Sequence, residues 1–315
     1  ESGLNTGIPR YIIQRVFKST SRKPKLFRDT LIPFWRNVCR TMKSLQGRQS
    51  RQTREEMSIA FLNGDYLALE TVRISPMDRG FLFGDGIYEL IPVHNGNPIG
   101  FNLHIDRMKE NLSAVEINLD WTHDQWREIC NKLVDKNGAG NLAIYLQVSR
   151  GVDTKRHHAY PEGITPTVFG FTSGITTSQE NDRTMVVPMK ISSAKDRRWH
   201  HCNIKSTALL GNVIHFQQGQ SEGNDETLLF NAADKVTEAS TSNVFVIKDG
   251  VVMTPLLNNQ VLPGITRLML IDMLRKDGSI PIEECVVTMS QVRDADEIWL
   301  SSSTKEVVPV IALDG

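Results

Sequence analysis

The sequence contains few cysteines, no paired cysteine motif and no long apolar run. Its four cysteines, Cys39, Cys130, Cys202 and Cys285, form no C-x-x-C pair, so we expect reduced thiols in a cytoplasmic protein. No stretch approaches the roughly 20 continuous apolar residues that a membrane-spanning helix needs, so no membrane partner is expected. A chain of 315 residues with 40% apolar and 23% charged residues is typical of a soluble globular protein of about two domains.

The formal net charge of the chain is zero, but the positively and negatively charged residues are unevenly distributed along it. Residues 1–56 carry 13 Lys and Arg against 4 Asp and Glu, a net +9, whereas the remaining residues carry 23 against 32, a net −9. The basic segment lacks a sustained amphipathic pattern, and regular strand signals begin only at Met57. We therefore interpret residues 1–56 as a basic extension outside the fold, upstream of a start at Met57. An Arg-rich targeting segment or a nucleic-acid-binding arm is the alternative interpretation.

From Met57 onward the pattern predicts a mixed α/β protein. The triplets Asn63-Gly64-Asp65 and Asn95-Gly96-Asn97 each separate two short strand-like runs, which predicts two hairpins. Apolar spacing predicts a helix within 103–117 and another over 265–276 that ends at Gly278. Further strands are predicted within 141–151, 165–172, 185–192 and 297–302.

A polar stretch rich in Gly, Ser and Thr, residues 172–183, divides this region. We therefore expect a small N-terminal domain over 57–174, a linker over 175–182 and a large cofactor-binding domain over 183–315. The sequence ends in "PVIALDG". The protein family whose motifs this sequence shares continues into a further helical segment, so we expect the last domain to be truncated at its C-terminus.

One lysine stands in an otherwise apolar and neutral run, "CNIKSTALLGNV". The residues that follow Lys205, over 208–216, have the spacing of a buried helix. A lysine in a strand–helix turn is more often structural than catalytic. A buried lysine, however, can have a lowered pKa and form a Schiff base with an aldehyde.

Other polar residues lie where a phosphorylated aldehyde cofactor would need them. Glu238 stands between two β-rich runs, and Gly264 precedes a helix whose first amides favour an anion. Taken alone, Glu238 can be interpreted as a surface carboxylate and the Gly264 turn as an ordinary helix cap. A Schiff-base lysine, a phosphate cup and a carboxylate beside a pyridine nitrogen together describe the binding of pyridoxal 5'-phosphate, whose ring acts as an electron sink. The residues that would complete the phosphate cup are Arg107, Ile265, Thr266 and Thr304.

From Met57 to Gly315 the sequence resembles the fold-type IV pyridoxal-phosphate aminotransferases, and within them most closely the D-amino acid aminotransferases. The resemblance rests on seven motifs in the family's order: "RGFLFGDGIYE", "HIDRM", "RHHAYPEG", "CNIKSTALLGNV", "VTEASTSNV", "LPGITR" and "SSSTKEV". It implies a two-domain α+β architecture, with a smaller N-terminal α/β domain and a larger, β-barrel-like C-terminal domain with helices. It also implies a homodimer.

The resemblance assigns a role to each matching residue. Lys205 matches the Schiff-base lysine and Glu238 the carboxylate on the pyridine nitrogen. Leu262 matches the residue packed against the cofactor ring, and the phosphate cup comprises Arg107, Ile265, Thr266 and Thr304. The trap for the substrate's α-carboxylate is formed by Tyr88, Arg156 and His158.

The carboxylate trap determines the expected substrate. On an extended segment Arg156 and His158 point to one side and His157 to the other, so the adjacent histidines chelate poorly and no metal is expected. The alternative interpretation of "TKRHHAYPE" is a solvated basic loop without a binding role. The family's branched-chain enzymes lack this Arg-x-His loop, and exchanging the carboxylate and side-chain pockets inverts the preferred enantiomer.

The implied activity is transamination of D-alanine-like D-amino acids with a 2-oxo acid such as 2-oxoglutarate or pyruvate. Alternatives within the fold are an L-branched-chain or aromatic aminotransferase and an (R)-amine transaminase. An aminodeoxychorismate lyase matches the carboxylate loop poorly. A nucleic-acid-binding protein with a degenerate cofactor domain is disfavoured by the intact Lys205 and Glu238, so no nucleic-acid partner is expected.

Overall fold

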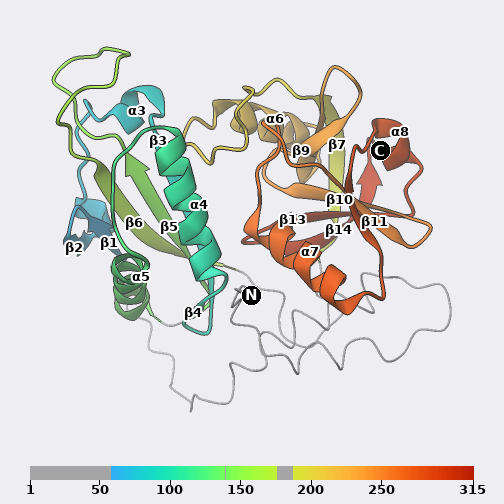
Figure 1. Cartoon of the computed structure of the whole chain (residues 1–315), viewed down its shortest axis with the longest axis horizontal. Coiled ribbons are helices and arrows are strands. Elements are labelled where there is room, and N and C mark those ends of the chain that lie inside the picture. Colours follow the sequence, from blue (N-terminus) through green and yellow to red (C-terminus); the bar gives the residue numbers. More distant parts are fainter. Residues whose placement is uncertain (1–57, 139, 176–186) are drawn as a thin grey trace. The chain divides into compact units, whose positions relative to one another are not determined.

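The computed structural model describes residues 58–138, 140–175 and 187–315, which form two compact units. The N-terminal unit comprises 58–138 and 140–175 together with 204–209, and the C-terminal unit comprises 187–203 and 210–315. Figure 1 labels most of the elements of both. The basic extension 1–56 and all of the predicted linker except residue 175 lie outside the described residues. Among those that are described, no helix combines the length and the apolar character needed to cross a bilayer.

The N-terminal unit is a six-stranded antiparallel sheet in the order β2-β1-β6-β5-β3-β4. Both predicted hairpins are confirmed, and Asn63, Gly64, Asn95 and Gly96 all have positive φ angles, as a tight two-residue turn requires. The elements of the unit are β1 (Ile59–Leu62), β2 (Asp65–Ala68), η3 (Leu69–Thr71), α3 (Arg79–Phe83), β3 (Gly86–His94), β4 (Asn97–Pro98), α4 (Phe101–Ala114), α5 (His123–Asn137), β5 (Leu142–Ser149) and β6 (Thr167–Gly174).

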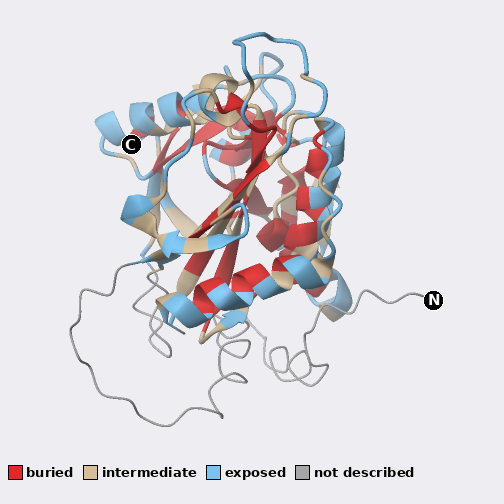
Figure 2. Ribbon diagram, turned by 90° about the vertical axis from the view of Figure 1, so that its left-hand side faces the viewer, coloured by how far each residue is buried: buried red, intermediate tan, exposed pale blue. Residues whose placement is uncertain are grey.

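Helices α4 and α5 supply much of the core of this unit. Along α5 the buried residues Trp126, Ile129, Leu133 and Val134 recur at helical spacing, and the helix starts at a capping box formed by Thr122. In Figure 2 the helices carry red, buried residues along one side and pale-blue, exposed residues along the other. One face of the sheet is therefore covered, and α4 is fixed along β3, the strand that carries Tyr88.

The C-terminal unit is built on an eight-stranded mixed sheet in the order β12-β11-β10-β13-β14-β7-β8-β9. Strand β9 lies at one edge, yet a short turn leads from it directly into β10, near the opposite edge. The sheet must therefore curl, as expected of a barrel-like domain. The elements of this unit are β7 (Met189–Lys195), α6 (Leu210–Ser221), β8 (Glu226–Phe230), β9 (Val236–Ala239), β10 (Asn243–Lys248), β11 (Val251–Pro255), α7 (Ile265–Asp277), β12 (Ile282–Cys285), α8 (Met289–Arg293), β13 (Glu297–Ser302) and β14 (Glu306–Leu313).

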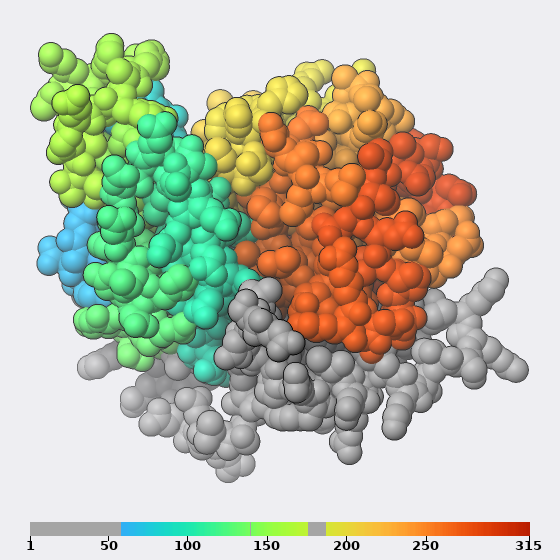
Figure 3. Space-filling view, in the orientation of Figure 1, coloured from blue at the N-terminus to red at the C-terminus, as the bar shows by residue number. Residues whose placement is uncertain are grey.

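Two apolar clusters fill the two faces of this sheet. Phe245 and Trp299 pack with α7 on one face, whereas Val244 and Leu300 belong to the cluster on the other, as alternation along a strand requires. The predicted helix ending at Gly278 is confirmed as α7, and Gly278 closes it in the left-handed conformation. The exposed side of α7, drawn in orange, lies on the surface in Figure 3.

The prediction of a buried helix after Lys205 is correct in type but wrong in burial. Helix α6 begins at Leu210, and Leu210, Val213 and Ile214 are 71%, 57% and 58% exposed. The apolar spacing is real, but no described part of the chain covers these three side chains.

Candidate active site

The lysine segment is fixed to β3 of the N-terminal unit by its backbone. Tyr88 donates its amide to the carbonyl of Lys205 at 3.0 Å, and Thr207 donates its amide to the carbonyl of Gly86 at 2.9 Å. Lys205 Nζ lies 4.1 Å from the centroid of the Tyr88 ring, which itself stacks on Tyr145. The amine is thus held over an aromatic face, within reach of a cation–π contact.

A glycine allows the lysine segment to approach this closely. Gly84 ends α3 with a φ of 66°, and a Cβ there would lie 2.9 Å from the Cα of Ala208. Thr207 Oγ1 donates to the carbonyl of Gly84 at 3.0 Å. Both the left-handed conformation and the lack of a side chain are needed at position 84.

Arg107 belongs to a buried polar group that the sequence reasoning missed. Arg107 Nε and Nη2 donate to the two carboxylate oxygens of Glu89 at 2.7 and 2.8 Å. His104 Nδ1 lies 2.6 Å from Glu89 Oε2. Glu89 is on β3, while His104 and Arg107 lie one turn apart on α4. The two hydrogen bonds to Glu89 fix the orientation of the Arg107 guanidinium.

The electrostatics of this group keep Glu89 ionised. Burial alone would raise the pKa of Glu89, but the charges and hydrogen bonds of Arg107 and His104 overcome it and lower that pKa to about 2. Burial lowers the pKa of His104, against the opposing pull of Glu89. A neutral imidazole whose Nδ1–H donates to the carboxylate is consistent with both directions.

The structure brings Arg156 and His158 onto one aromatic ring. The Arg156 guanidinium lies 5.0 Å from the centroid of the Phe83 ring, and the His158 ring lies 5.3 Å from it. Buried Arg79 holds the loop by donating to the carbonyls of His157 at 2.6 Å and His158 at 3.3 Å. Both Arg156 and His158 are exposed and thus accessible to a ligand.

Tyr88, the third residue predicted for the carboxylate trap, has different partners. Its ring contacts Tyr145 and Lys205. Among the described residues, no ring contact, hydrogen bond or ion pair links Tyr88 to Arg156 or His158. The structure therefore groups Arg156 with His158 and groups Tyr88 with the lysine.

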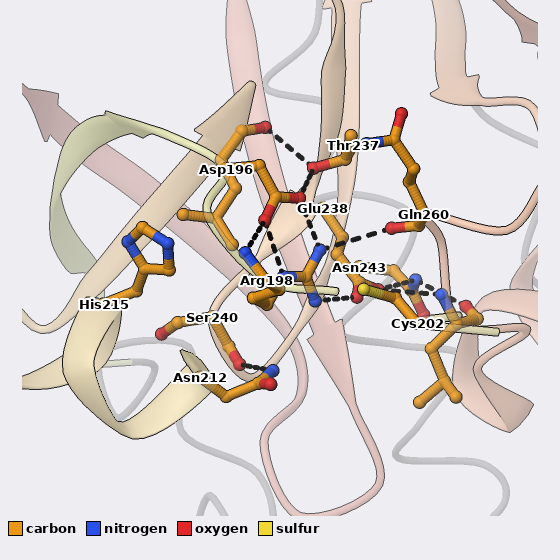
Figure 4. Close-up of polar contacts among 12 residues, drawn as sticks. Asp196, Arg198, Cys202, Asn212, His215, Thr237, Glu238, Ser240, Asn243 and Gln260 are labelled. Atoms are coloured by element: carbon orange, nitrogen blue, oxygen red, sulfur yellow. Dashed lines mark hydrogen bonds and ion pairs between the residues drawn. The ribbon is translucent and has the colours of Figure 1, made fainter. Parts of the chain in front are cut away.

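Glu238 lies on β9 of the C-terminal unit and is almost fully buried. Its Oε2 accepts from the amide of Leu262 at 3.0 Å and from Asn243 Nδ2 at 3.3 Å, while Oε1 accepts from Arg198 Nη1 (Figure 4). Burial raises the pKa of Glu238, and the charge and hydrogen bond of Arg198 oppose this rise. The carboxylate thus has the partners that a buried position demands.

Backbone amides and buried hydroxyls lie at the start of α7, where the sequence predicts an anion site. Gly264 caps the helix without a side-chain hydrogen bond, so no capping side chain satisfies the first amides, at Ile265 and Thr266. A Cβ on Gly264 would lie 2.0 Å from Asn243 Oδ1, so any larger residue would have to displace this amide. Ser301, paired with Asn243 across β13 and β10, has a buried Oγ without a hydrogen-bond partner in the described chain.

Thr304 lies in the turn between β13 and β14, next to Lys305. Lys305 Nζ donates to Glu226 Oε2 at 3.1 Å and to Thr241 Oγ1 at 2.9 Å. The fully buried Glu226 also accepts from the hydroxyls of Ser240 and Thr241. The Glu226 carboxylate therefore links the turn that follows β9, with Ser240 and Thr241, to the turn between β13 and β14.

Sequence reasoning missed several buried titratable residues, among them Glu89, His104 and Arg198, together with Asp196, which accepts from Arg198. A signal existed for His104 and Arg107, which stand three apart on a predicted helix. No local signal pairs Glu89 with them or Arg198 with Glu238, because those partners are 15 to 40 residues apart in sequence.

The fold and these residues define an enzyme of the aminotransferase type, and comparison with known proteins identifies the family. A family model described as "Amino-transferase class IV" matches residues 86–313, and the chain belongs to this family. D-alanine aminotransferase of Listeria monocytogenes (strain 10403S) is 35% identical over 254 residues, covering 81% of this chain and 87% of that protein. D-alanine aminotransferase of Staphylococcus aureus (strain MW2) is 36% identical over 260 residues, covering 82% and 90%.

Solved structures confirm the fold-type IV architecture. A branched-chain aminotransferase from Thermoproteus uzoniensis, with norvaline, has a TM-score of 0.75 at 23% identity and covers 82% of this chain and 88% of its own. A branched-chain amino acid aminotransferase from Escherichia coli has a TM-score of 0.72 at 20% identity, covering 82% and 86%. At these identities the likeness concerns the fold alone.

The enzyme class and its cofactor follow from the family. Class IV aminotransferases use pyridoxal phosphate, so this chain is a pyridoxal-phosphate-dependent aminotransferase. The described residues fit this cofactor. The uncapped start of α7 and the unpartnered Ser301 hydroxyl suit a phosphate, and buried Glu238 suits a ring N–H.

Proposed function

We propose that the enzyme transaminates D-amino acids, with D-alanine-like donors and a 2-oxo acid acceptor such as 2-oxoglutarate or pyruvate. The observation that carries this proposal is the meeting of Arg156 and His158 at Phe83 on an exposed loop that Arg79 anchors. A guanidinium binds a carboxylate through two parallel hydrogen bonds, which fixes the orientation of the substrate. The D-alanine aminotransferases at 35–36% identity support the same substrate class.

Each residue has a defined task in the proposed reaction. Lys205 would hold the cofactor covalently through its amine, and the same amine, once the substrate's amino group has displaced it, would remove the proton from the substrate's α-carbon. When bound, pyridoxal phosphate supplies the electron sink for the charge that develops on that carbon. Glu238 would accept a hydrogen bond from the ring N–H, Leu262 would pack against the ring, and Tyr88, which lies next to Lys205, would contact the substrate carboxylate that Arg156 and His158 bind.

Arg107 contributes through its fixed orientation. Because Glu89 holds two donors of Arg107, its guanidinium is oriented before any ligand binds. We place it with Ile265, Thr266 and Thr304 as the group that binds the phosphate.

The branched-chain alternative has less support in this chain. The structures at 20–23% identity include branched-chain enzymes, but that similarity carries the fold and not the substrate. The Arg-x-His loop favours the D-amino acid proposal, since the alternative does not need it.

We also propose that the enzyme works as a homodimer. Leu210, Val213 and Ile214 are exposed and stand at positions i, i+3 and i+4 of α6, the spacing of a helix face that packs against another surface. A Val213→Asp variant should shift sedimentation towards the monomer. A monomeric unmodified enzyme would contradict this assignment.

Covalent trapping tests the attachment residue. Borohydride treatment of the yellow protein should fix the cofactor on the tryptic peptide that contains Lys205. Lys205→Ala protein should carry no trapped label and show no transamination, whereas Lys195→Ala provides a control at another lysine of the chain. Label on a different lysine, or full activity of the Lys205→Ala protein, would contradict the assignment.

A further inference from the structure

The guanidinium of Arg198 lies between two buried carboxylates. Asp196 accepts from Arg198 Nε at 3.0 Å, Nη2 at 2.8 Å and its backbone amide at 3.0 Å, while Nη1 donates to Glu238 (Figure 4). The side chains of Arg198, Asp196 and Glu238 are only 2%, 3% and 7% exposed. Water therefore screens these charges weakly.

Asp196 determines which edge of Arg198 faces Glu238. Thr237, the residue before Glu238 on β9, donates its hydroxyl to Asp196 Oδ2 at 2.8 Å. Arg198 Nη2 also donates to the carbonyl of Gln260 at 3.2 Å. Since Nε and Nη2 are engaged by other partners, the planar guanidinium presents only Nη1 to Glu238.

With both carboxylates ionised, the group carries one net negative charge, and its neighbours do not remove it. Burial lowers the pKa of His215 on α6 and raises the pKa of Cys202 to about 11, so both are neutral near pH 7. Arg267 on α7 is paired with Glu284 at 2.8 Å. The two carboxylates and the Arg198 cation remain, with one negative charge in excess.

We propose that Asp196 is a positioning residue that acts through Arg198, holding Glu238 ionised while leaving the group one negative charge for a cationic ring N–H. Without Arg198, a buried Glu238 carboxyl would take up a proton. Without Asp196, Arg198 would neutralise Glu238 alone and weaken its hold on a cation. This inference rests on the proposed function for the identity of the cation.

A carboxyl carbon-13 titration of the full-length protein, with and without pyridoxal phosphate, tests the proposal. Arg198→Gln should raise the pKa of Glu238 by about 1–3, whereas Asp196→Asn should lower it. Asp272→Asn removes a half-exposed acidic charge of the same unit and serves as the matched control, with no change expected. Equal shifts in one direction for Arg198→Gln and Asp196→Asn, or no shift in either, would overturn the proposal.

A measurement on the unmodified protein remains decisive if a variant fails to fold. Burial would raise the pKa of Asp196, but the hydrogen bonds and charge of Arg198 lower it, whereas the pKa of Glu238 is raised. Glu238 should therefore protonate before Asp196 as the pH falls, and the reverse order would overturn the proposal. The titration without cofactor does not depend on catalysis. If the unmodified protein neither binds pyridoxal phosphate nor transaminates, the proposed function fails. The cofactor-free titration still tests whether Asp196 acts on Glu238 through Arg198.

Discussion

Replacing Glu89 by glutamine isolates the effect of one buried charge. Glu89 is fully buried and accepts from Arg107 at 2.7 and 2.8 Å and from His104 at 2.6 Å. The amide keeps the shape of the side chain but removes its charge and replaces one acceptor by a donor. Breaking a buried ion pair from one side costs about 3–5 kcal/mol, because the remaining guanidinium is left buried and unneutralised.

The lowered pKa of Glu89 gives a stability contribution of similar magnitude and predicts how that contribution depends on pH. A fall of the pKa from 4.5 to about 2 corresponds to about 3 kcal/mol. Because the folded pKa is depressed, this stability is fully present above pH 4.5, the unfolded value, and is lost as the pH falls towards 2. The stability gap between the unmodified protein and Glu89→Gln should be widest near pH 7 and vanish near pH 2.

Urea unfolding of the cofactor-free chain across this pH range measures the gap. Glu128→Gln removes a carboxylate from the exposed pair with Lys132 and should leave the free energy of unfolding almost unchanged. Glu89→Gln should also weaken the binding of pyridoxal phosphate, since Arg107 loses the group that orients it. Equal stability of Glu89→Gln and the unmodified protein at pH 7, or a gap that persists to pH 2, would refute the reasoning.

Four further predictions concern the active site, the thiols and the basic extension. Glu238→Gln should retain the cofactor but slow the α-proton transfer by about 10- to 150-fold, since a charge-assisted hydrogen bond contributes roughly 1.5–3 kcal/mol; an unchanged single-turnover rate would remove Glu238 from the mechanism. Arg156→Leu should raise the KM for D-alanine and reduce kcat/KM by about 10- to 150-fold with the cofactor still bound, and an unaltered KM would exclude Arg156 from the carboxylate trap. Because burial raises the pKa of Cys202 to about 11, iodoacetamide at pH 8 should leave this thiol unmodified until urea is added, and rapid labelling of the folded protein would contradict its burial. Deleting residues 1–56 should leave transamination intact, and lost activity would assign that segment to the enzyme.

Local signals predicted the parts of the fold that depend on local conformation. Asn63 and Asn95, each followed by glycine, specify turns with positive φ, and Gly278 specifies the end of α7. Such features need only neighbouring residues, so the sequence alone indicates them.

Features that depend on distant partners could not be predicted in this way. The pairing of Glu89 with Arg107 and of Arg198 with Glu238 joins elements that the fold alone brings together. The apolar spacing of α6 was read as burial, yet Val213 is 57% exposed, because spacing indicates a face that packs but not what covers it. The roles of the site residues came from motif resemblance, and the structure adds the contacts that orient them.

Enantiomer choice tests the central claim most directly. Initial rates should be measured for paired D- and L-amino acids with 2-oxoglutarate as acceptor, on the full-length protein loaded with pyridoxal phosphate. We predict a kcat/KM for D-alanine far above that for L-leucine. In the proposed reaction Arg156 holds the substrate carboxylate so that only the D-enantiomer presents its α-proton to Lys205. A much faster turnover of L-leucine than of D-alanine would contradict the account and favour the branched-chain alternative.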